Sequence, residues 1–293
     1  MATGEPSMIR TRILVGSLLA AAAVGLLVVD GYLGPWFPCL FVCLMVLGIL
    51  AGREFVRLIP ADFRPSEPLV LIGILFCLAA NWFPVVRAEL NQPTGAVWSL
   101  VLLCYVAMML AAFLQEMSRF REPGHAVPRL GVTLLAIGYL GILPSFFAQL
   151  RFLSPEQGAQ VMAVTIFVPK SNDIAAFFTG TFLGKHRMTP ILSPKKTWEG
   201  FAGGMIGGTL VAVVTSLATS LFPGGVIEAI GFGLVIGLAG VFGDLAESLL
   251  KRDCQTKDAS HSIPGFGGLL DVVDSVLFAA PLAYLWFTWN GLL

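Results

Sequence analysis

Long apolar runs recur along the whole chain and are separated by short polar segments. Most runs hold about 20 residues, enough for an α-helix to cross the hydrocarbon core of a bilayer. We expect such helices at about residues 13–29, 35–51, 68–86, 96–115, 130–149, 160–182, 201–221, 226–250 and 273–290. The pattern therefore predicts an all-α fold, a polytopic integral membrane bundle of about nine transmembrane helices.

The overall composition agrees with this prediction and excludes other classes of protein. Hydrophobic residues make up 56% of the chain and charged residues only 12%, whereas a soluble domain carries about 25% charged residues. Nucleic-acid binding is not expected, because no basic cluster alternates with aromatic residues on a soluble surface. The formal net charge is zero, so overall charge indicates no other partner. The five cysteines show no metal-ligand spacing.

The distribution of lysine and arginine predicts the orientation in the membrane. With the N-terminus in the cytoplasm, 15 of the 18 basic residues fall on the cytoplasmic side, and the exceptions are Arg87, Arg151 and Lys170. Cytoplasmic segments of membrane proteins carry such an excess. We therefore predict a cytoplasmic N-terminus, and the same model places two polar loops, 183–200 and 251–272, on the cytoplasmic side.

The sixth predicted span contains charged residues that a membrane does not readily accept. The stretch VPKSNDIAAFF, residues 168–178, holds Lys170 and Asp173 next to Pro169. Ionisable residues inside spans usually serve a function or neutralise one another. Two interpretations stay open: a functional site, or a Lys170–Asp173 pair that only stabilises the bundle.

Two further stretches indicate a site for phosphate and metal. GDLAESLLKR, residues 243–252, places Asp244, Glu247, Ser248 and Lys251 on one face of a helix. Carboxylate oxygens suit Mg²⁺, and an ammonium group beside them suits phosphate. Asp271 and Asp274 repeat the carboxylate spacing after a glycine-rich turn. The loop GKHRMTPILSPKKTWEG, residues 184–200, adds hydroxyl and ammonium groups, although an ordinary cytoplasmic loop would also be basic.

These stretches together resemble the phosphatidate cytidylyltransferases, the CDP-diacylglycerol synthases. Their signature is matched by GDLAESLLKRDCQTKDASHSIPGFGGLLDVVDS, at Ser248, Lys251, Arg252, Lys257, Asp258, Pro264, Gly265, Gly267, Gly268, Asp271 and Asp274. The upstream block NDIAAFFTGTFLGKHRMTPILSPKKTWEGFAGG resembles a second segment of that family. Two positions differ, since Phe266 replaces the usual histidine and Val272 the usual arginine. The N-terminal half matches only as generic transmembrane helices.

The resemblance implies transfer of CMP from CTP to phosphatidate, with release of pyrophosphate, at the cytoplasmic face of a bacterial-type inner membrane. Residues 1–160 would form N-terminal transmembrane helices, and residues 161–293 the catalytic region. Mg²⁺ is the implied cofactor, held by Asp244 and Asp271. The implied catalytic residues are these two aspartates, Lys251 and Asp173. Asp173 would face the same cavity and serve substrate or a second cation. Substrate binding is expected from Ser193, Lys195, Lys196, Thr197, Ser248, Arg252, Lys257, Asp258, Gly267 and Gly268.

The expected partners are CTP, phosphatidate and membrane lipid, without nucleic acid. Gly203, Gly204, Gly207 and Gly208 form overlapping GxxxG spacings, which predict close helix packing within the monomer or at a dimer interface. The resemblance favours a homodimer. The alternatives are a CTP-dependent lipid kinase, an inactive or substrate-shifted paralogue, and a transporter with Lys170 and Asp173 as its ion site. A non-catalytic scaffold would leave the two carboxylate stripes without a purpose.

Overall fold

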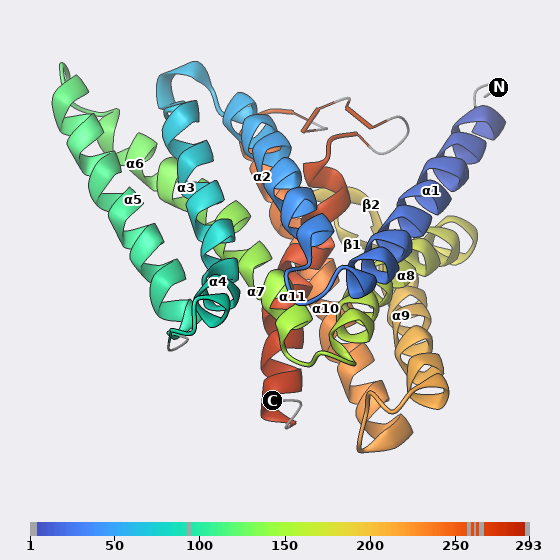
Figure 1. The fold of residues 1–293 in the computed structure, drawn as a ribbon. Coiled ribbons are helices and arrows are strands. Elements are labelled where there is room, and N and C mark those ends of the chain that lie inside the picture. Colours follow the sequence, from blue (N-terminus) through green and yellow to red (C-terminus); the bar gives the residue numbers. More distant parts are fainter. Residues whose placement is uncertain (1–4, 93–94, 257–258, 261, 264–266, 291–293) are drawn as a thin grey trace. The chain divides into compact units, whose positions relative to one another are not determined.

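A computed structural model of the chain describes residues 5–92, 95–256, 259–260, 262–263 and 267–290, with side chains from residue 14 onward (Figure 1). Within these residues, 9 helical segments are long and apolar enough to cross a membrane. The predicted all-α, multi-pass membrane fold is therefore confirmed. The chain divides into two compact units, Met1–Ala148 with Asp258–Val272, and Gln149–Lys257 with Val273–Leu293.

The first unit contains the N-terminal helices. Its elements are α1 (Glu5–Tyr32), α2 (Pro38–Leu58), the 3-10 turn η1 (Ala61–Phe63), α3 (Glu67–Ala79), the 3-10 turn η2 (Ala80–Trp82), α4 (Phe83–Glu89), α5 (Val97–Arg119), α6 (Ala126–Ile137), the π-helical turn η3 (Gly138–Ile142) and most of α7 (Leu143–Phe152). Two spans are interrupted helices, since α3, η2 and α4 make one and α6, η3 and α7 make another. One cluster of the core joins buried side chains of these interrupted spans and of α5: Cys77, Ala80, Val101, Met108 and Ile137.

The second unit contains α8 (Gly158–Leu183), the strands β1 (Arg187–Thr189) and β2 (Ser193–Thr197), α9 (Trp198–Ala218), α10 (Gly225–Asp253) and most of α11 (Leu270–Trp289). The strands pair as an antiparallel hairpin. Three buried phenylalanines pack α10 and α11 together beside the loop before α10, with ring centroids 5.1 Å apart for Phe232 and Phe287 and 5.3 Å apart for Phe222 and Phe232. Aromatic rings at such separations interact favourably beyond simple burial.

The glycines of α9 pack against α8 within this unit. A Cβ atom added to Gly208 would lie 2.9 Å from the carbonyl oxygen of Val168, and one added to Gly200 would lie 2.9 Å from that of Ala176. Small residues allow helix backbones to approach this closely. Of the two alternatives for the GxxxG spacing, the structure therefore shows the one within the monomer.

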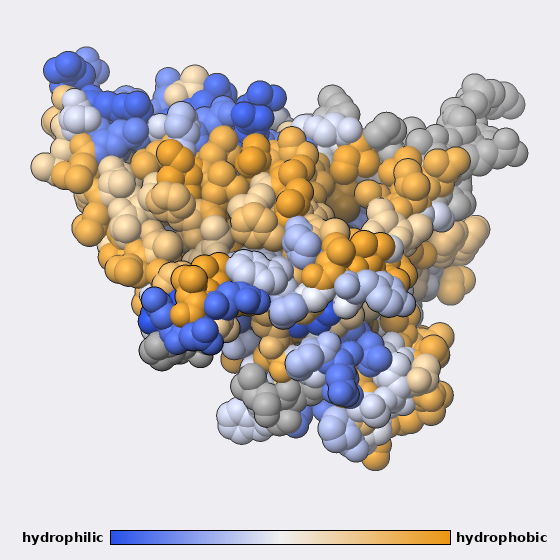
Figure 2. Space-filling view, viewed as in Figure 1, coloured by the Kyte–Doolittle hydropathy of each residue, from blue (hydrophilic) through white to orange (hydrophobic). Residues whose placement is uncertain are grey.

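The outward faces of several spans are strongly apolar. On α9, the face opposite the glycines exposes Ile206, Leu210, Val214 and Leu217, each with 55% or more of its surface accessible. On the first unit, hydrophobic residues cover the middle of α3 and α5, and hydrophilic residues gather at the ends of these helices (Figure 2). A soluble monomer rarely exposes such large patches. Lipid contact accounts for them.

Two features of the fold differ from the sequence prediction in detail. The second helix extends to Leu58, beyond the predicted end at 51, because the charged residues that follow stay helical. The loop predicted at 183–200 contains the β1–β2 hairpin, which the hydrophobic pattern did not indicate. Both differences concern polar segments, where apolar periodicity gives no signal.

Candidate active site

Charged side chains from four elements of the second unit meet in one cluster. Lys170 and Asp173 come from α8, Lys196 from β2, Asp244, Glu247 and Lys251 from α10, and Asp274 from α11. Helices α10 and α11 approach closely because residue 243 is glycine, and an added Cβ would lie 3.0 Å from the Cα of Ser275 and closer still to the carbonyl of Asp274. This contact brings Asp244, the next residue, beside Asp274.

Three carboxylates form the centre of the cluster. Oxygen atoms of Asp244, Glu247 and Asp274 all lie within 4.8 Å of one another. Glu247 and Asp274 are buried, with 1% and 5% of their surface exposed, whereas Asp244 is partly open. Buried carboxylates gathered so closely repel one another and need cations nearby.

Lysines supply part of that compensation. Lys196 Nζ lies 2.7 Å from Asp244 Oδ2, and Lys251 Nζ lies 2.8 Å from Glu247 Oε2. Lys170 Nζ lies 3.5 Å from oxygens of both Asp173 and Asp274. Among the described residues of the cluster, four carboxylates thus face three ammonium groups, the carboxylates of Asp173, Asp244, Glu247 and Asp274 and the ammonium groups of Lys170, Lys196 and Lys251. The Lys170–Asp173 pair is present, but it belongs to a larger cluster.

The residues of the cluster fit a divalent metal ion. Mg²⁺ prefers oxygen ligands, and the three neighbouring carboxylates provide them with an excess of negative charge. Ser248, also predicted from the sequence, donates a hydrogen bond of 3.4 Å from its Oγ to Asp244 Oδ1. Such contacts orient a carboxylate that holds a metal.

The β1–β2 hairpin presents the two predicted lysines differently. Side chains alternate between the faces of a strand, so Lys195 and Lys196 cannot both face the cluster. Lys196 reaches Asp244, whereas Lys195 is exposed. Thr197 Oγ1 accepts a hydrogen bond of 3.1 Å from Gly200 N–H and caps α9. The backbone carbonyl of Ser193 accepts one from Thr189 Oγ1 at 3.3 Å.

Two further residues, Glu199 and Arg252, hold the hairpin, and the sequence pattern assigns no role to Glu199. Glu199 Oε1 lies 2.6 Å from His186 Nδ1, and its Oε2 accepts hydrogen bonds from the backbone N–H groups of Lys185 and His186 at 3.1 and 3.2 Å. Arg252 Nε donates to the carbonyl oxygen of Leu192 at 3.3 Å. These contacts tie both ends of the hairpin and fix the strand that carries Lys196.

Asp271, Gly267 and Gly268 lie in the first unit. Asp271 Oδ2 accepts hydrogen bonds from the backbone N–H groups of Gly268, at 2.7 Å, and Ala259, at 3.3 Å. Gly267 has a φ of 102°, which favours glycine. The pairing of Asp271 with Asp244 stays a prediction. Lys257, Asp258 and Phe266 lie outside the described residues.

Three members of the cluster were not assigned to the site from the sequence. The sequence places Glu247 on the carboxylate face of α10, Asp274 in the signature, and Lys170 beside Asp173 in the transporter alternative, but none of the three is among the residues predicted for the cytidylyltransferase site. Their signal was helical spacing, which places Asp274 one turn after Asp271. Spacing alone cannot decide which of two carboxylates, three residues apart, faces a common centre.

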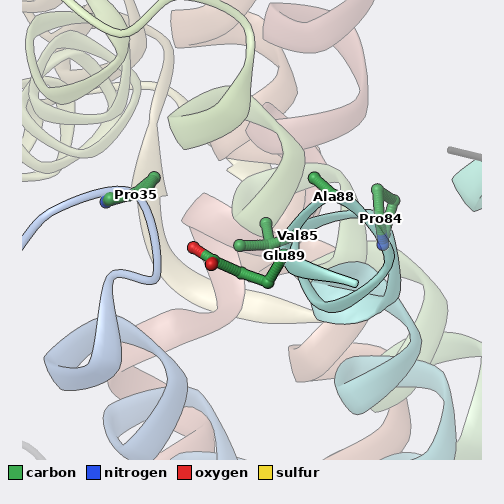
Figure 3. A pocket seen from close by; sticks show the side chains of 5 residues that line it. All are labelled: Pro35, Pro84, Val85, Ala88 and Glu89. Atoms are coloured by element: carbon green, nitrogen blue, oxygen red, sulfur yellow. The ribbon is translucent and has the colours of Figure 1, made fainter. Parts of the chain in front are cut away.

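A surface pocket is lined by residues of the first unit, whereas the charged cluster belongs to the second unit. Pro35, between α1 and α2, and Pro84, Val85, Ala88 and Glu89 of α4 line it (Figure 3). Trp36 Nε1 donates a hydrogen bond of 3.2 Å to Glu89 Oε1 next to it. The pocket contains none of the charged residues described above, so the cluster is the better candidate site.

Comparisons with known proteins cover nearly the whole chain. The family model described as the cytidylyltransferase family matches residues 10–289. A phosphatidate cytidylyltransferase of Bacillus subtilis is 32% identical over 94% of this chain and 96% of its own length. Those of Synechocystis sp. and Mycobacterium bovis are each 29% identical, over 93% and 96% of this chain and 94% and 88% of their own lengths.

Proposed function

The chain belongs to the cytidylyltransferase family, and on that premise we propose that it transfers the CMP moiety of CTP to phosphatidate, giving CDP-diacylglycerol and pyrophosphate. The similarity to enzymes named for this reaction extends over more than 90% of the chain. The observation in the structure that carries the proposal is the cluster of carboxylates and lysines around Asp244. Metal and phosphate recognition both require such groups.

The chemistry needs little from a general base. The phosphate monoester of phosphatidate is anionic near neutral pH, so one of its oxygens can attack the α-phosphorus of CTP directly. A new bond forms between that oxygen and the α-phosphorus. The bond from the α-phosphorus to the oxygen of the β-phosphate breaks, and pyrophosphate leaves with its electron pair. Catalysis then rests on alignment and charge neutralisation. Because no histidine base is needed, Phe266 is compatible with an active enzyme.

We assign the binding of Mg²⁺ to Asp244 together with carboxylates from the first turns of α11 and from α10. Asp274 and Glu247 lie beside Asp244 in the structure, and Asp271 is the ligand that the family resemblance implies. When bound, the ion would neutralise negative charge on the phosphates of CTP and on the departing pyrophosphate. Asp173, which pairs with Lys170, would serve substrate or a second cation.

The lysines and the polar residues of the hairpin would bind the phosphates of the two substrates. Lys196 and Lys251 contact carboxylates, and each can exchange such a partner for a phosphate oxygen. Lys195 is exposed on the other face of the hairpin and suits the anionic headgroup of a lipid. Ser193, Thr197, Ser248, Arg252, Lys257, Asp258, Gly267 and Gly268 complete the proposed substrate site.

The proposed orientation places the N-terminus and the active site on the cytoplasmic side, where CTP is available. The asymmetry of lysine and arginine supports it. The nine candidate spans among the described residues and the bacterial relatives support a multi-pass location in a bacterial-type cytoplasmic membrane. A homodimer remains part of the proposal on the family resemblance, and the α9 glycines give it no support because they pack on α8.

The products of the reaction test the proposed function. Purified protein with labelled CTP and phosphatidate should form CDP-diacylglycerol and pyrophosphate, and Mg²⁺ should be required. A lipid kinase would instead release CDP and transfer the γ-phosphate. Formation of CDP without labelled CDP-diacylglycerol would refute the proposal. A transporter would require Asp173 but tolerate the loss of Asp244.

A further inference from the structure

Glu54 is a buried glutamate near the end of α2, in the N-terminal half of the chain and outside both sequence blocks that carry the family signature. Its surface is 8% exposed. Among the described residues, no lysine, arginine or histidine forms an ion pair with it, and the neighbouring Arg53 pairs instead with Glu67, at 3.3 Å. A buried carboxylate without a cation is costly unless hydrogen bonds satisfy it.

Among the described residues, the hydrogen bonds of Glu54 lead to the signature segment, more than 200 positions away in the sequence. Oε1 accepts a hydrogen bond of 2.6 Å from Ser260 Oγ. Oε2 accepts one of 3.0 Å from the backbone N–H of Leu270, the first residue of α11. Glu54 therefore holds the segment at two points, one before and one after the glycine turn.

The same carboxylate sits at the start of a helix. The first backbone N–H groups of a helix have no partner within it and carry partial positive charge. Glu54 satisfies one of them at Leu270. Asp271 satisfies the N–H of Gly268 at 2.7 Å. A Cβ added to Gly268 would lie 2.8 Å from Glu54 Oε2 and 3.1 Å from Asp271 Oδ2, so a larger residue there would have to displace the carboxylate of Glu54.

We propose that Glu54 is a positioning residue for the transfer reaction, which anchors the signature segment at Ser260 and at the first turn of α11. The residues that it orients are those matched to the family signature: Gly267, Gly268 and Asp271 directly, and Asp274 one turn further along the same helix. The N-terminal helices thus contribute to catalysis as well as to membrane insertion. This inference rests on the proposed function for its catalytic part, and on the hydrogen bonds alone for the anchor.

The test compares Glu54→Ala with Glu54→Gln in the full-length protein in detergent micelles. Glutamine can still accept the N–H of Leu270 through its oxygen and donate to Ser260 Oγ through its nitrogen, whereas alanine can do neither. In Glu54→Ala we expect hydrogen exchange at the Leu270 amide to accelerate on the order of ten-fold or more, because a hydrogen bond to a charged group is lost. We expect kcat to fall by a similar factor and KM for CTP to change much less.

Glu54→Gln should stay close to wild type in both measurements, and Ser260→Ala, which removes one of the two contacts, should lie between. Glu67→Gln is the matched control, because Glu67 is a partly exposed glutamate of the same unit and forms its ion pair, among the described residues, with Arg53. A purely structural role would lower the melting temperature and the yield but leave kcat per folded molecule unchanged.

The outcomes separate the anchor from its catalytic role. Unchanged exchange at Leu270 in Glu54→Ala would refute the anchor, and accelerated exchange with wild-type kcat would refute the positioning role. If Glu54→Ala does not fold, Ser260→Ala decides, and wild-type exchange and kcat there would overturn the proposal. A wild-type protein that makes no CDP-diacylglycerol would refute the proposed function, while the exchange data would still test the anchor.

Discussion

Replacing Asp244 by asparagine keeps the size of the side chain and removes one negative charge from the carboxylate cluster. Asp244 Oδ2 lies 2.7 Å from Lys196 Nζ, and its carboxylate lies within 4.8 Å of those of Glu247 and Asp274. The substitution leaves three carboxylates and three ammonium groups among the described residues of the cluster, so they would offer a divalent cation no excess of negative charge.

The magnitude follows from Coulomb's law. Two unit charges about 5 Å apart interact by on the order of 3 kcal/mol at an effective dielectric constant of about 20, so the loss of one carboxylate charge weakens cation binding by at least about that energy. That energy corresponds to a factor of more than about 100 in an equilibrium constant. We therefore expect kcat/KM of Asp244→Asn to fall at least about 100-fold and the half-saturating Mg²⁺ concentration to rise. Folding should be little affected, because Lys196 is partly exposed and water can solvate it.

The assay is a Mg²⁺ titration of pyrophosphate release from CTP in mixed micelles of detergent and phosphatidate. Asp253→Asn is the matched control, since Asp253 is exposed at the end of the same helix, and its activity should stay within about two-fold of wild type. A thermal unfolding curve checks that Asp244→Asn is folded. An Asp244→Asn protein with wild-type turnover and an unchanged Mg²⁺ titration would refute the assignment of the metal site.

Three further predictions use the same preparation. Asp274→Asn should raise the half-saturating Mg²⁺ concentration on the order of ten-fold or more. If this variant gives the same Mg²⁺ titration as the wild type, Asp274 is not a ligand. Asp271→Asn, measured beside it, tests the ligand that the family resemblance implies. Lys196→Met should raise KM for CTP more than Lys195→Met, because only Lys196 reaches the cluster, and equal effects would contradict that distinction. Gly208→Leu should lower the melting temperature by overpacking the α8–α9 contact, at a cost of about 1–3 kcal/mol, whereas Leu210→Ala on the exposed face should not.

The spans could be predicted from the sequence because an apolar run of sufficient length has few alternatives to a transmembrane helix. Their ends could not, since charged residues at the membrane surface are compatible with helix and loop alike. The second span shows the consequence. The predicted end at residue 51 left Glu54 outside the helix, and its contact with Leu270 depends on tertiary structure alone.

The sequence predicts many of the residues that form the candidate site, but it does not predict which of them contact one another. The face of α10 with Asp244, Glu247, Ser248 and Lys251 follows from helical geometry and is present in the structure. The pairing of that face with Asp274 depends on how closely α10 and α11 approach at Gly243, which a single sequence does not encode in any periodic pattern. The hydrophobic pattern likewise does not predict the β1–β2 hairpin, which directs Lys196 and not Lys195 toward the cluster.

The glycine face of α9 has a consequence for how this helix can vary. Each glycine on it lies against backbone or side-chain atoms of α8, so a larger residue has no space. On the opposite face, Ile206, Leu210 and Val214 are exposed and can exchange with any apolar side chain of similar length. Saturation mutagenesis of residues 200–217 should therefore yield a tolerance profile with the period of the helix, about 3.6 residues. Such a profile would trace the α8–α9 contact from growth phenotypes alone.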